Sequence, residues 1–95
     1  MVQILAEVQV EDLQRFIAVF ATRGAEMRGK HGSQKSQVFG VSDDPGRVTI
    51  LFDWESREAF EGFLNDPAVK ETMKSSGTIP SPKFTFLSRI AELPH

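Results

Sequence analysis

Residues 48–60, which read VTILFDWESREAF, pass from a strand into a helix and decide the fold. Apolar side chains alternate with less apolar ones as far as Trp54, which is the pattern of a half-buried strand. Ser56 follows at once and is placed to cap a helix that carries Phe60. The stretch therefore predicts a strand at 47–54 that leads directly into a helix.

The rest of the chain repeats these two patterns. Val2–Val10 alternates like a strand, and apolar residues at spacings of three and four after Glu11 indicate one helix with Gly29 as its C-cap. Asp66 and Pro67 interrupt the later helix and start its second piece. The predicted elements are strands at 2–10, 33–41, 47–54 and 83–90, a helix from 11 to 27–29, a turn at 42–46, a broken helix at 56–77 and a loop with two prolines at 78–82.

This order, βαββαβ, predicts an α+β fold of the ferredoxin-like type in a single domain, residues 1–95. Four antiparallel strands would form one sheet with both helices on one face. The other face would carry either the set of Val48 and Phe84 or the set of Leu51 and Leu87, and both sets are too apolar to face water. The economical solution is a homodimer in which the same sheet face of a second copy covers it.

The same stretch carries a family resemblance. Residues 48–60, followed by Phe63-Leu64 and the Asp66-Pro67 break, resemble the antibiotic-biosynthesis-monooxygenase (ABM) group of dimeric α+β barrels. The resemblance implies a homodimer whose sheets pack face to face, with a pocket between each sheet and its own helices. Members of the group include cofactor-independent oxygenases of aromatic polyketides, quinol oxygenases, haem-degrading enzymes and proteins without a known activity.

The haem-degrading branch of that family uses three residues that this chain lacks. It has an Asn late in the first strand, a Trp in the helix after the third strand, and a haem-ligating His further along. The matching positions here are Val8, Phe63 and Met73. Methionine can ligate haem iron, but the Asn and Trp partners are absent as well. The comparison argues against haem degradation, and no cofactor is predicted.

The activity that the resemblance implies is a cofactor-independent monooxygenase acting on a small apolar molecule, aromatic or similar to a quinol or polyketide. In such a reaction the deprotonated substrate itself reacts with oxygen, while the protein supplies a dry pocket, a base and an oxyanion donor. Asp53 or His31 is the candidate base, and Arg89 or Trp54 the candidate polar contact. The candidate substrate-binding residues, chosen from predicted faces and family, are Trp54, Phe16, Phe20, Phe52, Phe60, Phe63 and Met73.

Each of these residues also has a simpler interpretation. Asp53 could pair with Arg89 across an interface between subunits, His31 could be a solvated loop residue, and Trp54 could be a core ring with its N–H paired. Two other functions therefore stay open. The protein could be a non-catalytic dimer that binds a small molecule, or a structural dimer whose pocket is filled by its own eight phenylalanines.

Composition excludes several classes of protein. The chain has no cysteine and two histidines, so neither disulfides nor a metal-ligand spacing can be formed. Eleven basic and thirteen acidic residues give a net charge of −2, which argues against nucleic-acid binding. No apolar run approaches the roughly 20 residues that span a bilayer, and no signal-peptide pattern is visible. The predicted location is therefore the cytoplasm, without a membrane partner.

Overall fold

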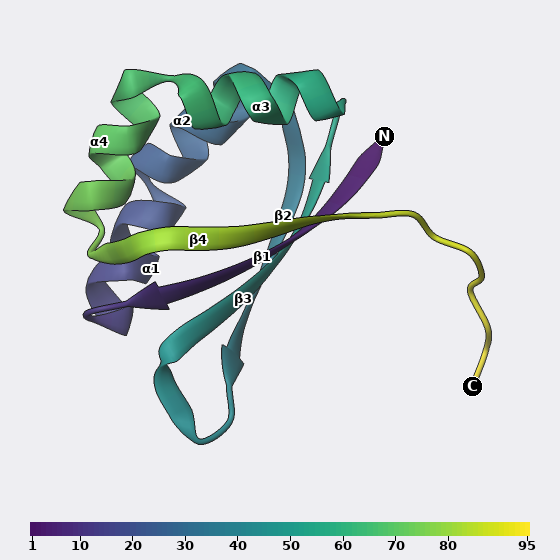
Figure 1. Cartoon of the computed structure of the whole chain (residues 1–95), viewed down its shortest axis with the longest axis horizontal. Helices are drawn as coiled ribbons and strands as arrows, with labels where there is room; N and C mark the ends of the chain where they lie inside the picture. The colour runs from purple at the N-terminus through teal and green to yellow at the C-terminus, as the bar shows by residue number, and fades with distance from the viewer.

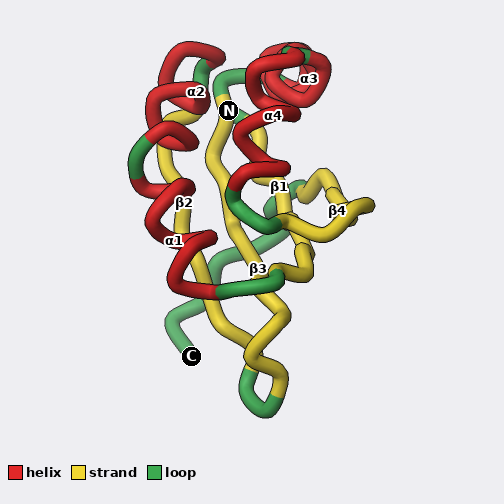
Figure 2. Tube along the Cα trace, turned by 90° about the vertical axis from the view of Figure 1, so that its left-hand side faces the viewer, coloured by secondary structure: helices red, strands yellow, loops and turns green.

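The computed structural model describes residues 1–95 and contains one four-stranded antiparallel sheet in the order β2-β3-β1-β4. Short helices cover one face of the sheet, with α1 and α2 in one column and α4 and α3 in a second column beside it (Figures 1 and 2). This arrangement confirms the predicted ferredoxin-like α+β fold. The elements are β1 (Val2–Val10), α1 (Leu13–Ala21), α2 (Arg23–His31), β2 (Ser33–Val41), β3 (Asp44–Trp54), α3 (Arg57–Asn65), α4 (Pro67–Ser75) and β4 (Thr78–Leu87).

The hydrophobic core lies between the sheet and the helices. On the two central strands, Ile4 pairs with Phe52 and Ala6 pairs with Ile50, so that alternate side chains of both strands point to the helices. Burying them, together with the helix rings, removes a large apolar area from water and is the main source of stability. The buried apolar residues are Ile4, Ala6, Val8, Val10, Phe16, Val48, Ile50, Phe52, Trp54, Phe60, Phe63 and Val69.

The broken helix after β3 forms as predicted. The Ser56 hydroxyl accepts a hydrogen bond from the Ala59 N–H at 3.1 Å and caps α3. The Asp66 carboxylate accepts one from the Ala68 N–H at 2.9 Å and caps α4, whose first residue is Pro67. Each cap satisfies an N–H that the helix itself leaves unpaired, and proline has no N–H to lose at that position.

The prediction of one continuous helix ending at 27–29 is wrong in two respects: the helix is broken, and it ends later. The chain forms two helices that meet at Thr22, whose backbone is not helical. The Thr22 hydroxyl donates to the Ala18 carbonyl at 2.7 Å, which is the local bonding by which threonine competes with a continuing helix. The second helix passes through Gly29 and ends at His31, with Gly32 as its C-cap in the left-handed conformation at a φ of 111°.

The third and fourth strands also begin earlier than predicted. The turn contains Ser42 and Asp43 only, and β3 starts at Asp44. Strand β4 occupies 78–87 instead of 83–90 and includes both prolines of the predicted loop. It is an edge strand that pairs only with β1, so the missing N–H groups of its prolines are tolerated. As a consequence Arg89 lies outside the sheet, in the C-terminal segment that extends away from the helices (Figure 1).

The open face of the sheet carries the set of Leu51 and Leu87, which settles the alternative that the sequence left open. Leu5 and Leu51 are direct cross-strand partners on this face. Phe39 on β2 is 50% exposed and Leu87 is 37% exposed. The face therefore combines a central apolar area with polar neighbours, and none of the helices covers it (Figures 1 and 2).

Candidate functional site

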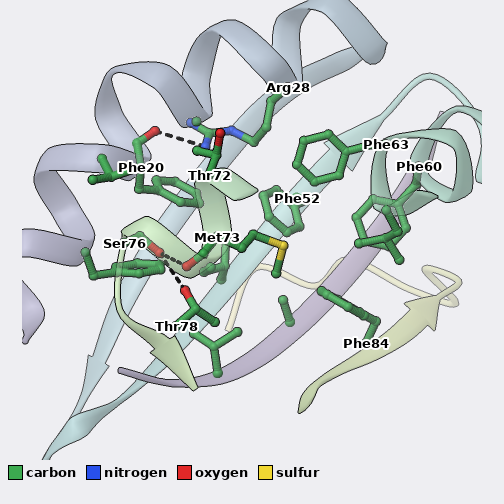
Figure 3. Close-up of a pocket in the computed structure, with 17 residues that line it drawn as sticks. Phe20, Arg28, Phe52, Phe60, Phe63, Thr72, Met73, Ser76, Thr78 and Phe84 are labelled. Atoms are coloured by element: carbon green, nitrogen blue, oxygen red, sulfur yellow. Dashed lines mark hydrogen bonds between the residues drawn. The ribbon is translucent and has the colours of Figure 1, made fainter. Parts of the chain in front are cut away.

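An apolar cavity of about 70 Å³ lies between the helix layer and the sheet (Figure 3). Side chains from both helix columns and from three strands line it, so its shape depends on how the helices pack on the sheet. Its walls are mostly phenylalanine and aliphatic side chains, and only four of its residues have polar side chains. The lining residues are Ala6, Val8, Phe16, Val19, Phe20, Gly24, Arg28, Ile50, Phe52, Phe60, Phe63, Leu64, Thr72, Met73, Ser76, Thr78 and Phe84.

Arg28 is the only charged residue that lines the cavity. The residue is 8% exposed and forms no ion pair. Its Nη1 donates to the Phe20 carbonyl at 3.0 Å, and its Cζ lies 3.7 Å from the centre of the Phe20 ring. Burial lowers the pKa of Arg28 to about 10, so the guanidinium is charged at neutral pH. A guanidinium has five N–H donors, and the chain supplies one hydrogen-bond acceptor for them.

The break between α1 and α2 positions this guanidinium. Because α1 ends before Thr22, the carbonyl of Phe20 is left without a helical partner and faces Arg28, which lies six residues beyond the break on α2. Gly24 lies on the same side of α2, where a Cβ atom would come within 3.0 Å of Arg28 Nη1. A larger residue at that position would push against the guanidinium. The glycine therefore leaves the space in which Arg28 reaches the cavity.

The three hydroxyls of the cavity have partners of their own. Thr72 donates to the Ala68 carbonyl at 2.8 Å. Ser76 bonds the Met73 carbonyl at 2.6 Å and the Thr78 hydroxyl at 2.8 Å, as Figure 3 shows. These groups can rotate toward a ligand, but they are neutral and already satisfied. Arg28 is thus the polar group with the most unused hydrogen-bonding capacity in the cavity.

The structure brings together six of the seven side chains that the sequence suggested for substrate binding. The exception is Trp54, which is fully buried at the end of β3 and does not line the cavity. Its ring packs on Phe60 and Phe63, with centroids 5.2 and 5.0 Å apart, and its Nε1 has no hydrogen-bond partner. The expected pairing of the indole N–H is therefore wrong. The six that line the cavity are Phe16, Phe20, Phe52, Phe60, Phe63 and Met73.

The suggested catalytic residues do not converge on the cavity. Asp53 lies on the open face of the sheet, where Gln3 donates to its carboxylate at 3.2 Å. Arg89 shares a surface hollow with Asp53, but its guanidinium pairs with Glu92 at 3.6 Å. Asp53 is separated from the cavity by the sheet, because residues adjacent along a strand point to opposite faces and its neighbour Phe52 lines the cavity. Arg89 lies beyond the end of β4 and does not line the cavity.

His31 lies on the helix side but outside the cavity. Its Nε2 is 2.8 Å from Asp66 Oδ2, which joins the end of α2 to the start of α4. The hydrogen bond with His31 lowers the pKa of the Asp66 carboxyl, and the bond from the Ala68 N–H acts in the same direction. The His31 ring also packs edge-on against Phe63, 5.8 Å away between centroids. These contacts give His31 a role in holding helices together.

Sequence reasoning missed Arg28 because its surroundings were predicted incorrectly. With one continuous helix ending at Gly29, Arg28 would occupy the last turn, where a basic side chain is ordinary. The only signal was its position one helical turn after Gly24, which places both residues on one side of the helix. No cluster of three or more His, Cys, Asp or Glu side chains is arranged to hold a metal ion. None of the helices is long and apolar enough to cross a membrane.

A ferredoxin-like sheet with an apolar cavity beneath its helices defines the class of fold. Within that class, the model of the antibiotic biosynthesis monooxygenase family matches residues 1–75, and the chain belongs to this family. A comparison with curated proteins finds no match.

Solved structures give the same fold at low sequence identity. SnoaB, a cofactor-independent oxygenase from Streptomyces nogalater, superposes with a TM-score of 0.77 at 17% identity, covering 99% of this chain and 97% of SnoaB. A Caulobacter crescentus protein provisionally described as an antibiotic biosynthesis monooxygenase gives 0.73 at 16% identity, covering 95% and 90%. A conserved protein from Methanosarcina mazei gives 0.68 at 18% identity, covering 90% and 89%. At these identities the likeness is one of fold.

Proposed function

We propose that this protein is a cofactor-independent monooxygenase that acts on a small apolar molecule, aromatic or similar to a quinol or polyketide. Membership of the family supports the class of reaction, as does the fold shared with SnoaB. The observation that carries the proposal is the cavity itself, which is lined mainly by apolar side chains and contains one cation. Such a cavity stabilises a substrate anion while keeping bulk water away from it.

The reaction can be balanced without a redox group from the protein. A methylene group between aromatic rings loses a proton, and the resulting carbanion, delocalised onto an oxygen, transfers electrons to O2. One oxygen atom becomes the new carbonyl oxygen and the other leaves as water, so that CH2 and O2 give C=O and H2O. The protein has to bind the substrate, stabilise its negative charge and exclude solvent. Apolar walls and a buried guanidinium fulfil these tasks.

The cavity contains no side chain suited to accept the proton of the substrate. No carboxylate or imidazole lines the cavity, and both suggested bases, Asp53 and His31, lie outside it. We therefore propose that the substrate is acidic enough to ionise on binding, with its proton leaving through solvent at the mouth of the cavity. Arg28 then stabilises the anion, a task that needs no base in the cavity.

We also propose that two copies pair through the open face of the sheet. Leu5, Leu51 and the half-exposed Phe39 supply the apolar centre, as the packing of one sheet on another requires. Burying this area twice, once on each copy, follows the rule that two-fold interfaces use the same patch on both subunits. The cavities then lie on the outer sides of the dimer, each beneath its own helices.

Oxygen consumption with anthrone as the probe tests the proposed activity. Purified protein should consume O2 and form anthraquinone whose new carbonyl carries label from 18O2. Met73→Phe narrows the cavity and replaces its most adaptable side chain by a rigid ring, so it should strongly lower the protein-dependent rate. Met27→Phe makes the same change on α2, outside the cavity, and should keep it. No uptake by the wild type, or equal rates in the two variants, would contradict the proposal.

A non-catalytic binding protein is the second candidate. Two observations favour it: no base lines the cavity, and the volume of about 70 Å³ is roughly half that of an engineered cavity known to bind benzene. An aromatic ligand must therefore displace part of the wall, and Met73, with three rotatable bonds, is the most adaptable part. Binding of anthrone without oxygen uptake would favour this function over the enzyme.

A further inference from the structure

Arg28 presents an imbalance of charge that the fold itself does not explain. Carrying a charge into an apolar cavity costs free energy unless an opposite charge compensates it. The side chain is 8% exposed, yet no carboxylate pairs with it and no other charged residue lines the cavity. The Phe20 carbonyl accepts the one side-chain hydrogen bond that Arg28 donates within the chain, and the Phe20 ring is its cation–π partner. Neither of them carries a negative charge.

The position of the guanidinium points to a partner inside the cavity. Figure 3 shows Arg28 reaching from α2 to the Phe20 carbonyl, with its guanidinium beside Thr72 at the edge of the cavity. One nitrogen, Nη1, is used by the Phe20 carbonyl, and the guanidinium has further donors in a planar fork. A planar fork of this kind fits an oxygen anion, and the surrounding rings fit an apolar body.

We propose that Arg28 is the specificity-determining residue of the cavity, and that the ligand binds as an oxyanion on a planar apolar body. A phenolate or an enolate meets this description, whereas its uncharged ether does not. The anion supplies the negative charge that the cavity lacks, and the apolar walls bind the rest of the molecule. The inference deepens the proposed function, since it names the substrate class of the same cavity, but it concerns binding and ionisation only.

Binding at this site should change the acidity of the ligand. A positive charge in contact with an acidic group favours its ionised form and lowers its pKa by about one to three units. An apolar cavity without that charge has the opposite effect, because it destabilises the anion. The sign of the change in ligand pKa therefore reports whether Arg28 contacts the ionising oxygen.

4-Nitrophenol is a suitable probe because its phenolate is yellow and its phenol is not. With the wild-type protein in excess, the phenolate band should appear at a lower pH than for the free compound. Arg23→Met, on the same helix but outside the cavity, should behave like the wild type. In Arg28→Met, the pKa of bound 4-nitrophenol should be higher than that of the free compound.

The matching uncharged compound is 4-nitroanisole, in which a methyl group replaces the acidic proton. Equilibrium dialysis should show that the wild type binds it at least about tenfold more weakly than 4-nitrophenolate, because it cannot use the charge-assisted hydrogen bonds. This comparison needs no variant, so it holds even if Arg28→Met fails to fold. Arg28→Gln provides a second variant that keeps hydrogen-bonding capacity without the charge.

Three results would overturn the inference: no binding of 4-nitrophenol to the wild type, a bound pKa equal to or above the free value, or equal binding of the anisole. The proposed oxygenase activity fails separately. Ligand ionisation at Arg28 without oxygen uptake from anthrone would contradict the enzyme and leave the oxyanion site intact. Oxygen uptake from anthrone with no effect of Arg28 on ligand ionisation would contradict the oxyanion site and leave the proposed enzyme intact.

Discussion

The two faces of the sheet differ in where they place charge. The open face carries several charged groups in contact with water, such as Asp53 and the pair of Lys83 and Glu7 at 3.9 Å. The cavity beneath the helices contains one, Arg28, and it is buried. Charges at a surface cost little and contribute little, whereas a buried charge without a partner is expensive. A buried charge that lowers the stability of the fold is therefore better evidence of function than the exposed acidic and basic residues that are easy to notice in the sequence.

The largest expected effect is the loss of stability when a core ring on the helix-covered side of the sheet is removed. Phe60 is fully buried and packs on the rings of Phe52, Trp54, Phe63 and Phe84. Phe60→Ala should lower the free energy of unfolding by about 3–5 kcal/mol, because it leaves a cavity in the core. Urea denaturation measures this loss. An unchanged urea midpoint would mean that the core is not where the structure places it.

A second substitution tests the proposed pairing of open faces. Leu51→Asp places a charge at the centre of the open sheet face and should convert the dimer to a folded monomer. Sedimentation velocity reports the mass, and circular dichroism reports whether the fold persists. Lys70→Asp, at an exposed position of α4, is the control and should remain dimeric. A wild type that is monomeric, or a Leu51→Asp variant that still pairs, would rule out this interface.

A smaller effect is expected from Asp66, whose pKa is lowered by its hydrogen bond with His31. A carboxyl with a lowered pKa in the folded protein stabilises it above the ordinary value of 3.8, and this contribution disappears as the pH falls through the lowered pKa. Asp66→Asn keeps the helix cap but removes the charge. Urea curves should show the variant less stable than the wild type at pH about 7, with the gap closing under acid conditions. A gap independent of pH would assign the effect to packing.

The smallest effect on the free energy of unfolding should come from Arg28→Met, in contrast to the large loss expected for Phe60→Ala. Arg28→Met loses the bond to the Phe20 carbonyl but also removes a buried charge, and such replacements are often neutral or stabilising. The change in the free energy of unfolding should be within about 1 kcal/mol of zero, or favourable. Thermal and urea unfolding measure it. A loss as large as that of Phe60→Ala would make Arg28 a structural residue.

Several parts of the fold could be predicted from the sequence because their signals are local. The alternation along β3, the Ser56 cap and the Asp66-Pro67 break each act within a few residues. The break at Thr22 could not be predicted in this way, since apolar residues continue at helical spacing on both sides of it. Prolines in β4 are acceptable only because the strand lies at an edge, which depends on the order of strands in the sheet.

The residues of the candidate site could also be predicted only where their signals are local. The phenylalanines of the cavity could be identified from their faces, because burial follows periodicity. Arg28 could not, because its burial depends on the break at Thr22 and on the space left by Gly24. Asp53 and His31 attracted attention as titratable residues, yet one lies on the opposite sheet face and the other pairs with Asp66.

The central claim is that the oxygenase reaction takes place on the helix-covered side of the sheet. The most direct test measures oxygen uptake from anthrone by two variants side by side. Arg28→Met removes the one cation of the cavity, and Asp53→Asn removes the carboxylate on the opposite face. We predict that Arg28→Met loses about a hundredfold or more in rate, the size of effect expected for one electrostatic stabiliser, while Asp53→Asn keeps the wild-type rate. Loss of activity in Asp53→Asn with full activity in Arg28→Met would contradict the account.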